Sequence, residues 1–385
     1  MSGSIVIAHD YFTQRGGAER VALDLARTFD HAPIVTSFLD HARTHAAARH
    51  HTIRPSPWNR ARALRADPRR ALPLLPRIWN QTVAEGDVLV ASSSGWAHGV
   101  GSDFRRRIVY CHNPARWLYQ AQDYPLPSAL RRGEPLTRPM MDALRRWDSR
   151  QAHRADVYIA NSRTVSERIH AAYGIQATVL HPAVTDLREI DQAPVDDLSP
   201  GSYLLSVARL MPYKHVLEVA EALDTRPDLR LAVVGDGPLA PQLVGRFGDR
   251  VAWLPGISDS QLAWLYANCA ATISASHEDF GLTPIEGFQF GRPALLLRKG
   301  GFLETQIEDT TGLFFDEPTP SAIGETIDRF LHRRFDASTI EAHAQTFSFA
   351  SFAKRLRALV ETSPHQDDTR GAHQPQRDRS HGRRS

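Results

Sequence analysis

The sequence predicts an α/β protein made of two doubly wound domains, each with a parallel sheet covered by helices on both faces. Short apolar, β-branched runs alternate with amphipathic helical patterns, which is typical of buried parallel strands. The length of 385 residues suits two hydrophobic cores better than one. The formal charge also changes sign, because residues 1–185 contain 25 Arg and Lys against 15 Asp and Glu, whereas residues 186–362 contain 16 against 25.

The expected strands fall into two sets, one in each half of the chain. Those of the first half are Ile5–Ala8, Ile34–Phe38, Val88–Ser92, Arg107–Cys111, Val157–Asn161 and Thr178–Leu180. Those of the second half are Tyr203–Ala208, Leu231–Val234, Val251–Leu254, Ala271–Ala275, Pro293–Leu297 and Gly312–Phe315. Amphipathic helices are expected between them at Ala18–Phe29, Leu144–Ala155, Ser260–Asn268 and Ile323–Arg333.

A polar stretch rich in Asp and Pro, residues 182–200, is the expected linker. We therefore predict an N-terminal domain at residues 1–185 and a second domain at residues 186–345. An amphipathic pattern predicts a C-terminal helix within residues 346–362, and residues 363–385 lack apolar periodicity and are expected to be disordered. Ligands of doubly wound sheets bind at the carboxyl ends of the strands, so we expect a binding cleft between the two domains.

The composition excludes several protein classes. With 42% hydrophobic and 23% charged residues, the chain is neither collagen-like, disulfide-rich nor wholly disordered. No apolar run approaches 18 residues, so no transmembrane helix is expected, and the first residues lack the pattern of a secretory signal. Cys111 and Cys269 are far apart in the sequence, which indicates a reduced, cytoplasmic protein without a cysteine metal site.

A glycine pair follows the first expected strand. Gly16 and Gly17 precede a helical pattern, so their backbone N–H groups could approach an anion at a helix N-terminus. The spacing is not that of a dinucleotide-binding loop, and a simple tight turn remains an alternative.

Two cations follow the first strand of the second half. Arg209 and Lys214 lie on one loop that Pro212 stiffens, and a guanidinium with an ammonium suits a diphosphate. Only three of the 46 basic residues are lysines, which favours a functional role for Lys214 over a solvated surface pair. Gly235, after the next strand, could help to form the same pocket, although a plain turn is the commoner explanation.

The strongest motif follows the expected strand Ala271–Ala275. Gly281 permits close backbone approach, and Pro284 favours the first turn of a helix. The free N–H groups at that helix start could meet a phosphate or a sugar oxygen. Glu278 can reach a ligand there, and Glu286 lies about one turn into the helix. The candidate donor-binding residues of this motif are Glu278, Asp279, Phe280, Gly281, Leu282 and Glu286.

At these residues the sequence resembles the family 4 glycosyltransferases, retaining enzymes with two Rossmann-like domains facing across a cleft (the GT-B fold). Glu278 and Glu286 match the E-x7-E motif of that family, and Arg209 with Lys214 match its diphosphate-binding pair. The loop at Gly16 matches its N-terminal glycine loop. The resemblance covers about residues 4–360 and, through the stretch Tyr110–Trp117, is closest to bacterial mannosyltransferase-like enzymes of surface polysaccharide synthesis.

The resemblance implies a reaction and roles for individual residues. Arg209 and Lys214 would stabilise the leaving diphosphate electrostatically, without a metal ion. Glu278 would bind sugar hydroxyls, Glu286 the ribose, and His112 the sugar from the acceptor side. The implied donor is a nucleotide diphosphate sugar, GDP-mannose above others, with no further cofactor. The implied acceptor is a glycan or lipid-linked molecule of polysaccharide or glycolipid synthesis, and the C-terminal helix is expected to cross back to the first domain.

The basic first half indicates an anionic partner. Residues 60–79 mix arginines with Trp and Leu, which suits docking at an anionic inner membrane face as well as an ordinary solvated helix and loop. No nucleic-acid motif accompanies the charge, so no nucleic-acid partner is expected.

Two other classes of function stay open at the level of sequence. One is another enzyme on this fold. A sugar-nucleotide epimerase would lack the Arg209–Lys214 arrangement, and a phosphorylase would need a lysine for pyridoxal phosphate, for which the three lysines offer no clear candidate. The other is a non-catalytic module that binds sugar nucleotides, which turnover by the purified protein would exclude.

Overall fold

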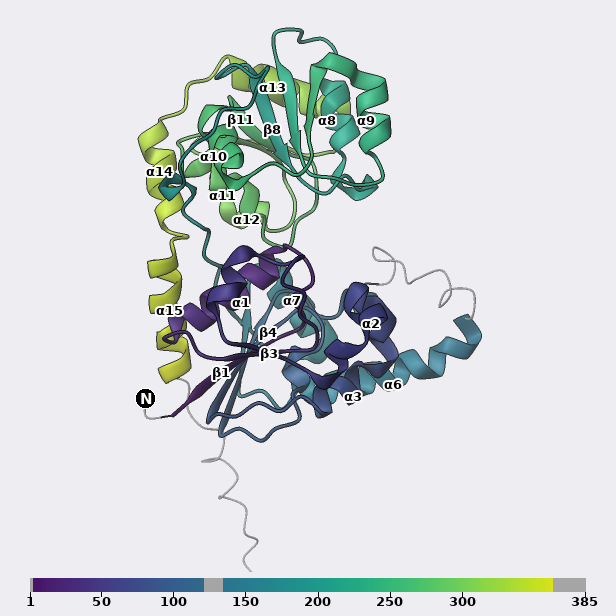
Figure 1. The fold of residues 1–385 in the computed structure, drawn as a ribbon. Helices are drawn as coiled ribbons and strands as arrows, with labels where there is room; N and C mark the ends of the chain where they lie inside the picture. The colour runs from purple at the N-terminus through teal and green to yellow at the C-terminus, as the bar shows by residue number, and fades with distance from the viewer. Residues whose placement is uncertain (1–2, 121–133, 363–385) are drawn as a thin grey trace, which may run out of the picture.

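The computed structural model describes residues 3–120 and 134–362. Figure 1 shows two α/β lobes, the N-terminal lobe below and the C-terminal lobe above, with the last helix running down the side of the lower lobe. Each lobe contains one parallel sheet, so the predicted fold of two doubly wound domains is confirmed.

The N-terminal sheet has seven strands in the order β3-β2-β1-β4-β5-β6-β7, and every adjacent pair is parallel. The register pairs His9 with Ser92 and Ser93 with Cys111, so the carboxyl ends of β1, β4 and β5 meet at one edge. The strands are β1 (Ile5–His9), β2 (Ile34–Thr36), β3 (Ile53–Pro55), β4 (Val88–Ser93), β5 (Arg106–Cys111), β6 (Val157–Ala160) and β7 (Thr178–Val179).

The C-terminal sheet has six parallel strands in the order β10-β9-β8-β11-β12-β13. Its strand order changes direction between β8 and β11, as that of the other sheet does between β1 and β4. Ligands of such sheets bind at this switch point. The strands are β8 (Tyr203–Val207), β9 (Arg230–Val234), β10 (Val251–Leu254), β11 (Ala271–Ser274), β12 (Ala294–Leu297) and β13 (Gly312–Phe315).

Helices cover both faces of each sheet (Figure 1). Those before β8 are α1 (Gly17–Thr28), α2 (Arg62–Ala66), α3 (Leu75–Asn80), α4 (Arg116–Tyr119), α6 (Glu134–Ala152) and α7 (Arg163–Tyr173). Those after β8 are α8 (Val216–Ala222), α9 (Ala240–Phe247), α10 (Asp259–Asn268), α11 (Leu282–Phe288), α12 (Phe302–Thr305), α13 (Pro320–Leu331), α14 (Ala337–Gln345) and α15 (Phe349–Thr362).

Local signals in the sequence set several helix ends. Ser258 and Gln261 form a capping box at the start of α10, so two backbone N–H groups are satisfied there. Thr319 caps α13, whose first residue is Pro320. Gly174 ends α7 with φ +71°, a conformation that glycine adopts at little cost.

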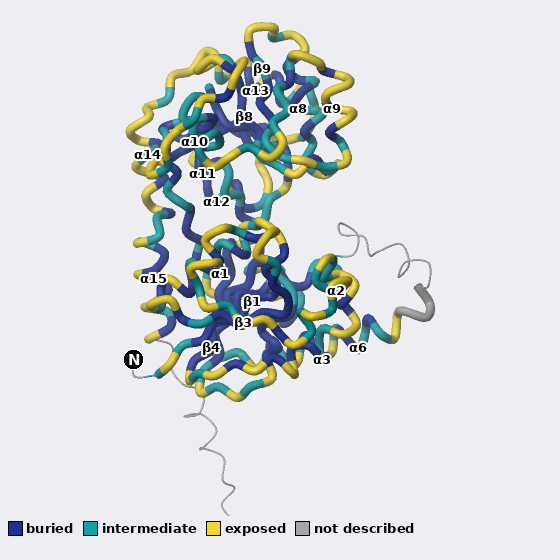
Figure 2. Tube along the Cα trace, viewed as in Figure 1, coloured by how far each residue is buried: buried dark blue, intermediate teal, exposed yellow. Residues whose placement is uncertain are grey.

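The central strands of each sheet are buried on both faces, as Figure 2 shows by the dark trace through each lobe. Successive residues of β1 enter different cores, because side chains alternate along a strand. Val6 joins a cluster with Trp79, whereas Ile7 joins a cluster with Leu25 of α1. This burial explains why the strands of both sheets appear in the sequence as short apolar runs.

Helix α15 packs against the N-terminal domain although it follows the C-terminal domain in sequence. Phe352, Leu356 and Val360 are buried in the cluster that contains β1 and α1. Arg357 also donates hydrogen bonds to the carbonyl of Thr28 at 2.7 and 3.1 Å. The chain therefore crosses between the lobes twice.

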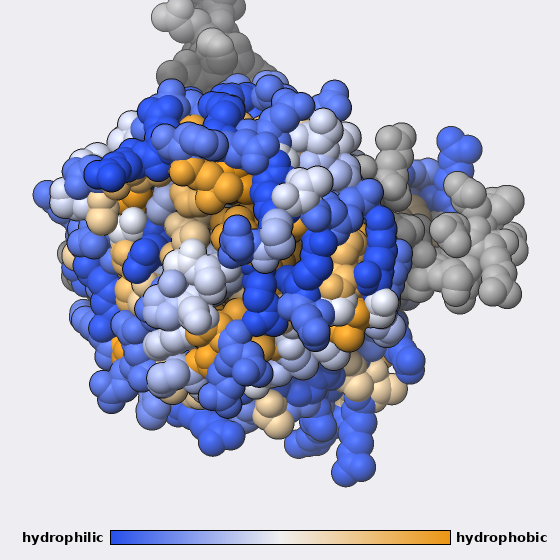
Figure 3. Space-filling model, turned by 90° about the horizontal axis from the view of Figure 1, so that it is seen from above, coloured by the Kyte–Doolittle hydropathy of each residue, from blue (hydrophilic) through white to orange (hydrophobic). Residues whose placement is uncertain are grey.

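The largest differences between the predicted and the observed elements are at β3 and α6. Strand β3 was not expected, because Arg54 and Pro55 are exposed and leave no apolar run. The predicted helix Leu144–Ala155 is longer at its start, since α6 begins at Glu134, with Pro139 inside it. The predicted tail at residues 363–385 lies outside the described residues. Seen from above, the molecule presents mainly hydrophilic side chains with small apolar areas between them (Figure 3).

Candidate active site

A cavity of about 850 Å³ lies between the two domains and contains most of the predicted site. Its walls come from loops that follow β1, β4 and β5 of one sheet and β8 and β11 of the other. The predicted residues that line it are Gly16, Gly17, His112, Arg209, Lys214, Glu278, Asp279, Phe280, Gly281 and Leu282. Gly235 and Glu286 are not among its lining residues.

Lys214 and Glu278 meet inside this cavity. The Lys214 ammonium donates to a Glu278 carboxylate oxygen, and the two side chains are 12% and 27% exposed. Arg209, on the same loop, donates to the Tyr213 hydroxyl at 3.0 Å, and the Lys214 nitrogen lies 5.2 Å from the centre of the Tyr213 ring. Tyr213 thus contacts both cations.

Gly235 supports the loop that carries Arg209. A Cβ atom at Gly235 would lie 2.1 Å from the carbonyl oxygen of Ala208, and the residue has φ +138°. The neighbouring backbone is bonded to the same loop, because Leu210 donates its N–H to the Asp236 carbonyl at 2.9 Å. Gly235 therefore packs against the backbone of Ala208 and Arg209 and supports the position of the Arg209 loop.

Glycines also position the loop from Glu278 to Leu282. Gly281 has φ +88°, and a Cβ atom there would lie 2.4 Å from the Phe302 ring. Behind the loop, the Gly301 N–H donates to the Glu278 carbonyl at 2.8 Å, and a Cβ atom at Gly301 would lie 2.2 Å from the Phe280 backbone. Larger residues at these glycines would displace Glu278 from the cavity wall.

The Gly16–Gly17 loop approaches the other domain and encloses a buried carboxyl group. A Cβ atom at Gly17 would lie 3.1 Å from the Leu282 side chain, so the loop faces the start of α11 across the cleft.

Glu19 lines the same cavity, is 1% exposed and has one carboxyl oxygen without a hydrogen-bond partner. Burial raises the pKa of Glu19 to about 7, against hydrogen bonds from the backbone and from the Gln14 side chain.

His112 follows β5 and faces the cavity from the N-terminal side. Its Nε2 atom lies 2.8 Å from the Ser92 hydroxyl. Burial, followed by repulsion from His9, lowers the pKa of His112 to about 3. At neutral pH the ring is therefore uncharged. It is suited to a hydrogen bond with a hydroxyl and poorly suited to general-base catalysis.

Asp279 joins the two domains. Its carboxylate accepts from Asn113 at 3.0 Å and forms ion pairs with Arg116 and Arg168, all three on the N-terminal domain. Burial alone would raise its pKa, but the two guanidinium groups overcome this and hold the pKa of Asp279 below its usual value. Asp279, predicted to bind the donor, thus also acts as a bridge between the lobes.

Glu286 is not among the residues that line the cavity, and its two carboxylate oxygens contact one residue of each domain. One oxygen accepts from the buried Tyr266 hydroxyl at 2.6 Å, and the other lies 3.4 Å from a guanidinium nitrogen of Arg20 on α1. The residue is 9% exposed. Its predicted contact with a ribose stays a prediction.

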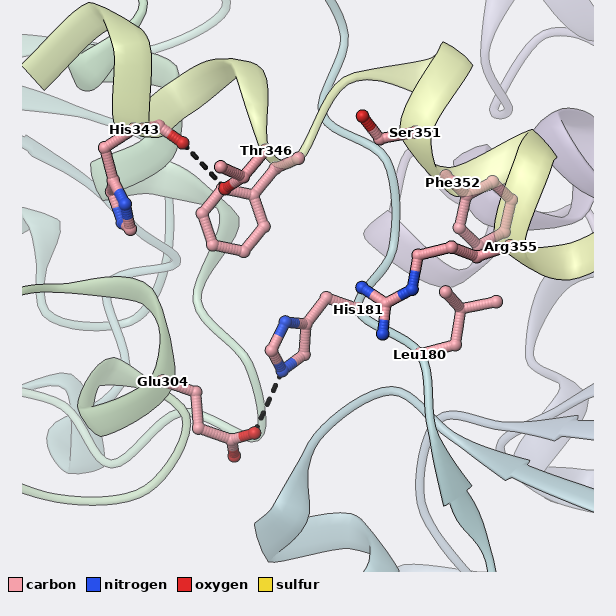
Figure 4. A pocket seen from close by; sticks show the side chains of 9 residues that line it. Leu180, His181, Glu304, His343, Thr346, Ser351, Phe352 and Arg355 are labelled. Carbon is pink, nitrogen blue, oxygen red and sulfur yellow. Dashed lines mark hydrogen bonds and ion pairs between the residues drawn. The ribbon is translucent and has the colours of Figure 1, made fainter.

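A second cavity, of about 250 Å³, lies where both chain connections pass between the lobes. Figure 4 shows His181, on the connection after β7, pointing to Glu304 of α12, with a nitrogen–oxygen distance of 3.0 Å. Arg355 of α15 lines the same cavity. The Glu304 carboxylate also accepts from the Arg163 backbone N–H at 2.8 Å, so this junction ties the lobes together beside the cleft.

Sequence reasoning missed several residues of the cavity wall. Asp10, directly after β1, accepts from the backbone N–H groups of Ser94, Trp96 and Ala97 at 2.6 to 2.8 Å. The position of Asp10 directly after a buried strand is the feature of the sequence that could have indicated its place in the site. Glu19 follows the Gly16–Gly17 pair, and Asn113 and Arg116 lie in the stretch Tyr110–Trp117. The residues around them in the sequence do not indicate which contacts they make.

The site therefore brings two cations of the C-terminal domain to face a histidine of the N-terminal domain that is uncharged at neutral pH. Arg209 and Lys214 can compensate a diphosphate, Glu278 can accept from hydroxyl groups, and His112 lies on the opposite wall. Among residues 3–120 and 134–362, no three His, Cys, Asp or Glu side chains gather with the geometry of a metal site. No described helix combines the length and the apolar character that crossing a bilayer requires.

A GT-B glycosyltransferase is the class of protein that this fold and cleft define. Residues 15–186 match the family model described as "Glycosyltransferase Family 4", and residues 191–346 match "Glycosyl transferases group 1". The two models follow one another along the chain and together account for most of it. The chain belongs to the family 4 glycosyltransferases.

Curated relatives share modest identity with the chain. "Alpha-1,3/1,6-mannosyltransferase ALG2" of Dictyostelium discoideum is 30% identical over 29% of this chain and 28% of the relative. The human ALG2 is 26% identical over 64% of this chain and 65% of the relative. "Uncharacterized glycosyltransferase YqgM" of Bacillus subtilis is 27% identical over 52% and 58%. The chain thus spans less than two thirds of the length of these relatives.

Solved structures agree in fold. Anabaena HepE, crystallised with UDP and glucose, has a TM-score of 0.68 at 18% identity and covers 93% of this chain and 99% of its own. The lipopolysaccharide outer core galactosyltransferase WaaB has a TM-score of 0.62 at 17% identity, with 93% and 99% covered.

Proposed function

We propose that this protein transfers a hexose, mannose above others, from a nucleotide diphosphate sugar to a hydroxyl of a glycan or lipid-linked acceptor, with retention of configuration. The observation that carries the proposal is the pair of cations, Arg209 and Lys214, beside Glu278 in a cleft between two doubly wound domains. A guanidinium and an ammonium in fixed positions compensate the charge that develops on a leaving diphosphate.

The residues take distinct roles in this reaction. Arg209 and Lys214 bind the diphosphate, and Lys214 exchanges its bond with Glu278 for one with phosphate oxygens. Glu278 then accepts from the hydroxyls of the transferred sugar. His112, uncharged at neutral pH, hydrogen-bonds the sugar from the acceptor side. Because the two cations supply the positive charge, no metal ion and no further cofactor are proposed.

GDP-mannose is the donor that we propose, because several relatives carry the name of mannosyltransferases. UDP-glucose is the competing donor, because HepE was crystallised with it. A paired-carboxylate hydrolase is disfavoured, since Glu278 lines the cavity and Glu286 does not, so the two cannot flank one glycosidic bond.

A thermal-shift screen against GDP-, UDP-, ADP- and dTDP-sugars tests the proposal. We expect one GDP-sugar to raise the unfolding temperature and the K214A variant to abolish that shift. Release of the nucleoside diphosphate in the presence of an acceptor then distinguishes an enzyme from a non-catalytic binding module. Absence of stabilisation by every nucleotide sugar would contradict the proposal.

We propose in addition that the protein docks on an anionic membrane surface through residues 60–79. This segment contains α2 and α3, and Arg60, Arg69 and Arg70 are exposed on it. Arginines near a negative surface contribute about 1 kcal/mol each to binding. Flotation with anionic vesicles should show binding that high salt removes, and no binding at low salt would contradict this part.

A further inference from the structure

A buried serine connects two histidines behind the N-terminal wall of the cleft. Ser92 of β4 is fully buried, and His9 of β1 is 1% exposed. The parallel register places His9 beside Ser92, and His112 directly follows the neighbouring strand β5. The Ser92 hydroxyl oxygen lies 3.0 Å from Nδ1 of His9 and 2.8 Å from Nε2 of His112. The hydroxyl therefore stands between the two rings.

A backbone carbonyl sets the direction of these hydrogen bonds. Nδ1 of His9 lies 3.1 Å from the carbonyl oxygen of Ser92 as well as near its hydroxyl. A carbonyl oxygen can only accept a hydrogen bond, so Nδ1 of His9 must carry a hydrogen. That N–H donates to both oxygens of Ser92. The hydroxyl hydrogen of Ser92 is then available for donation to Nε2 of His112.

This donation decides where His112 carries its own hydrogen. Nε2 accepts from Ser92, so in the uncharged ring the single hydrogen is on Nδ1. Among the described residues, none bonds to Nδ1 of His112, and this atom is not one of their fully buried polar atoms without a partner. Because His112 lines the cavity, its Nδ1 reaches the cavity surface.

We infer that His9 and Ser92 are positioning residues for the transfer reaction, which fix His112 as the tautomer that presents an N–H group to the cleft. His112 then donates to an oxygen of the bound sugar, and at that atom it cannot take a proton from the acceptor hydroxyl. Neither His9 nor Ser92 lines the cavity, so both act through His112. This inference rests on the proposed function, because a sugar must lie against His112.

Nitrogen NMR of protein with ¹⁵N-labelled histidine observes the tautomer directly, because a ring nitrogen with a hydrogen and one without it resonate far apart. H112Q identifies the signals of His112 by their loss. We expect a hydrogen on Nδ1 and none on Nε2 in the wild type at neutral pH. The opposite tautomer, or an even mixture of the two, would overturn the inference.

Variants of Ser92 link the tautomer to the reaction. S92A should give a mixture of tautomers and lower kcat/KM for GDP-mannose roughly 5-fold, the value of one neutral hydrogen bond. S92T keeps the hydroxyl and should retain the wild-type tautomer and rate. S93A is the matched control on the same strand, because the Ser93 hydroxyl lies against His98 instead, and it should leave the tautomer unchanged. A single Nδ1–H tautomer in S92A would overturn the role of Ser92.

Variants of His9 test the first step of the relay. H9L removes the donor that directs the Ser92 hydroxyl, so His112 should again populate both tautomers. H9N places an amide N–H where Nδ1 of the ring was and should restore the wild-type tautomer. If H9L and H9N gave the same tautomer as the wild type, His9 would have no positioning role.

The tautomer is measured without a nucleotide sugar, so its outcome is separate from that of the proposed function. Turnover of a nucleotide sugar by a protein whose His112 shows mixed tautomers rejects the positioning role alone. Conversely, a fixed Nδ1–H tautomer in a protein that binds no nucleotide sugar rejects the transfer reaction and, with it, the role of His9 and Ser92 in that reaction.

Discussion

The ammonium of Lys214 donates to the carboxylate of Glu278 across 64 residues of sequence. The two residues follow β8 and β11, which are neighbours in the C-terminal sheet, so the strand order itself brings them together. The pair fixes the position of each charge at the mouth of α11. The Lys214 ammonium also balances the negative charge of Glu278 where a diphosphate would bind.

Replacing Lys214 tests its role in donor binding. K214A should weaken binding of the nucleotide sugar on the order of 100-fold, because a hydrogen bond to a charged group contributes roughly 1.5–3 kcal/mol. The loss should lie near the upper end of this range, since Glu278 is then left to repel the phosphates. Calorimetric titration with the donor measures the effect. K354A, at an exposed lysine of α15, is the control, and equal affinity in K214A and K354A would remove the diphosphate assignment.

Breaking the Asp279 bridge should loosen the two lobes. D279N removes the charge that Arg116 and Arg168 share, and because this network is only partly buried the loss should lie below the about 3–5 kcal/mol of a fully buried pair. We expect a larger radius of gyration by small-angle X-ray scattering and faster proteolysis between the domains. D328N breaks a more exposed pair with Arg226 inside one domain and should change neither. An unchanged radius in D279N would show that other contacts hold the lobes.

Parts of the site that follow buried strands were predictable from the sequence. Arg209, Lys214 and Glu278 each lie on a loop that a clear apolar run precedes, and parallel strands bring such loops to one edge. The partners of Asp279 were not predictable in this way. Arg116 and Arg168 are 163 and 111 residues away, and only the arrangement of the two domains brings them together.

The fold shows the same division between local and long-range information. Most strands were found within one or two residues, since burial on both faces makes them apolar. Strand β3 was missed because it is a short edge strand with exposed Arg54 and Pro55. The hydrogen bond that Glu286 accepts from Tyr266 could not be read from the motif, because Tyr266 lies on α10, outside the motif, and only the fold brings the two side chains together.

The buried carboxyl of Glu19 should make stability depend on pH. Its pKa is about 7 in the folded protein against 4.5 for the ordinary group, so the folded state binds more protons between these values. The free energy of unfolding therefore falls as pH rises from about 4.5 to 7, by up to roughly 3 kcal/mol. E19Q removes this loss and should gain stability relative to the wild type as pH rises. Urea unfolding at pH 5 and pH 8 measures the change.

The exposed Glu85 provides the control for that experiment. E85Q should track the wild type at both pH values, because its carboxyl is in water in either state. A difference between E19Q and the wild type that stays constant from pH 5 to pH 8 would show that Glu19 is not the group responsible.

Removal of divalent metal should leave transfer intact. Arg209 and Lys214 supply the positive charge that a leaving diphosphate requires, so the rate should not depend on an added cation. Initial rates with EDTA and with Mg²⁺ are compared at the same ionic strength. A complete loss of activity in EDTA that Mg²⁺ restores would contradict this prediction and reassign the two cations to binding alone.

Helix α15 should be required for the stability of the N-terminal domain rather than of the domain it follows. Leu356 is fully buried in the cluster formed with β1 and α1, and replacing a buried leucine by alanine costs about 2–5 kcal/mol. L356A should therefore lower the unfolding temperature of the N-terminal domain. Calorimetry measures the unfolding temperatures, and tryptophan fluorescence recorded in parallel assigns the transition, because five of the seven tryptophans lie in the N-terminal domain. L331A, at a leucine of α13 that is 53% exposed, should leave both domains nearly unchanged. If L356A destabilised only the C-terminal domain, this prediction would be wrong. The contact of α15 with the N-terminal domain would then contribute little to the stability of that domain.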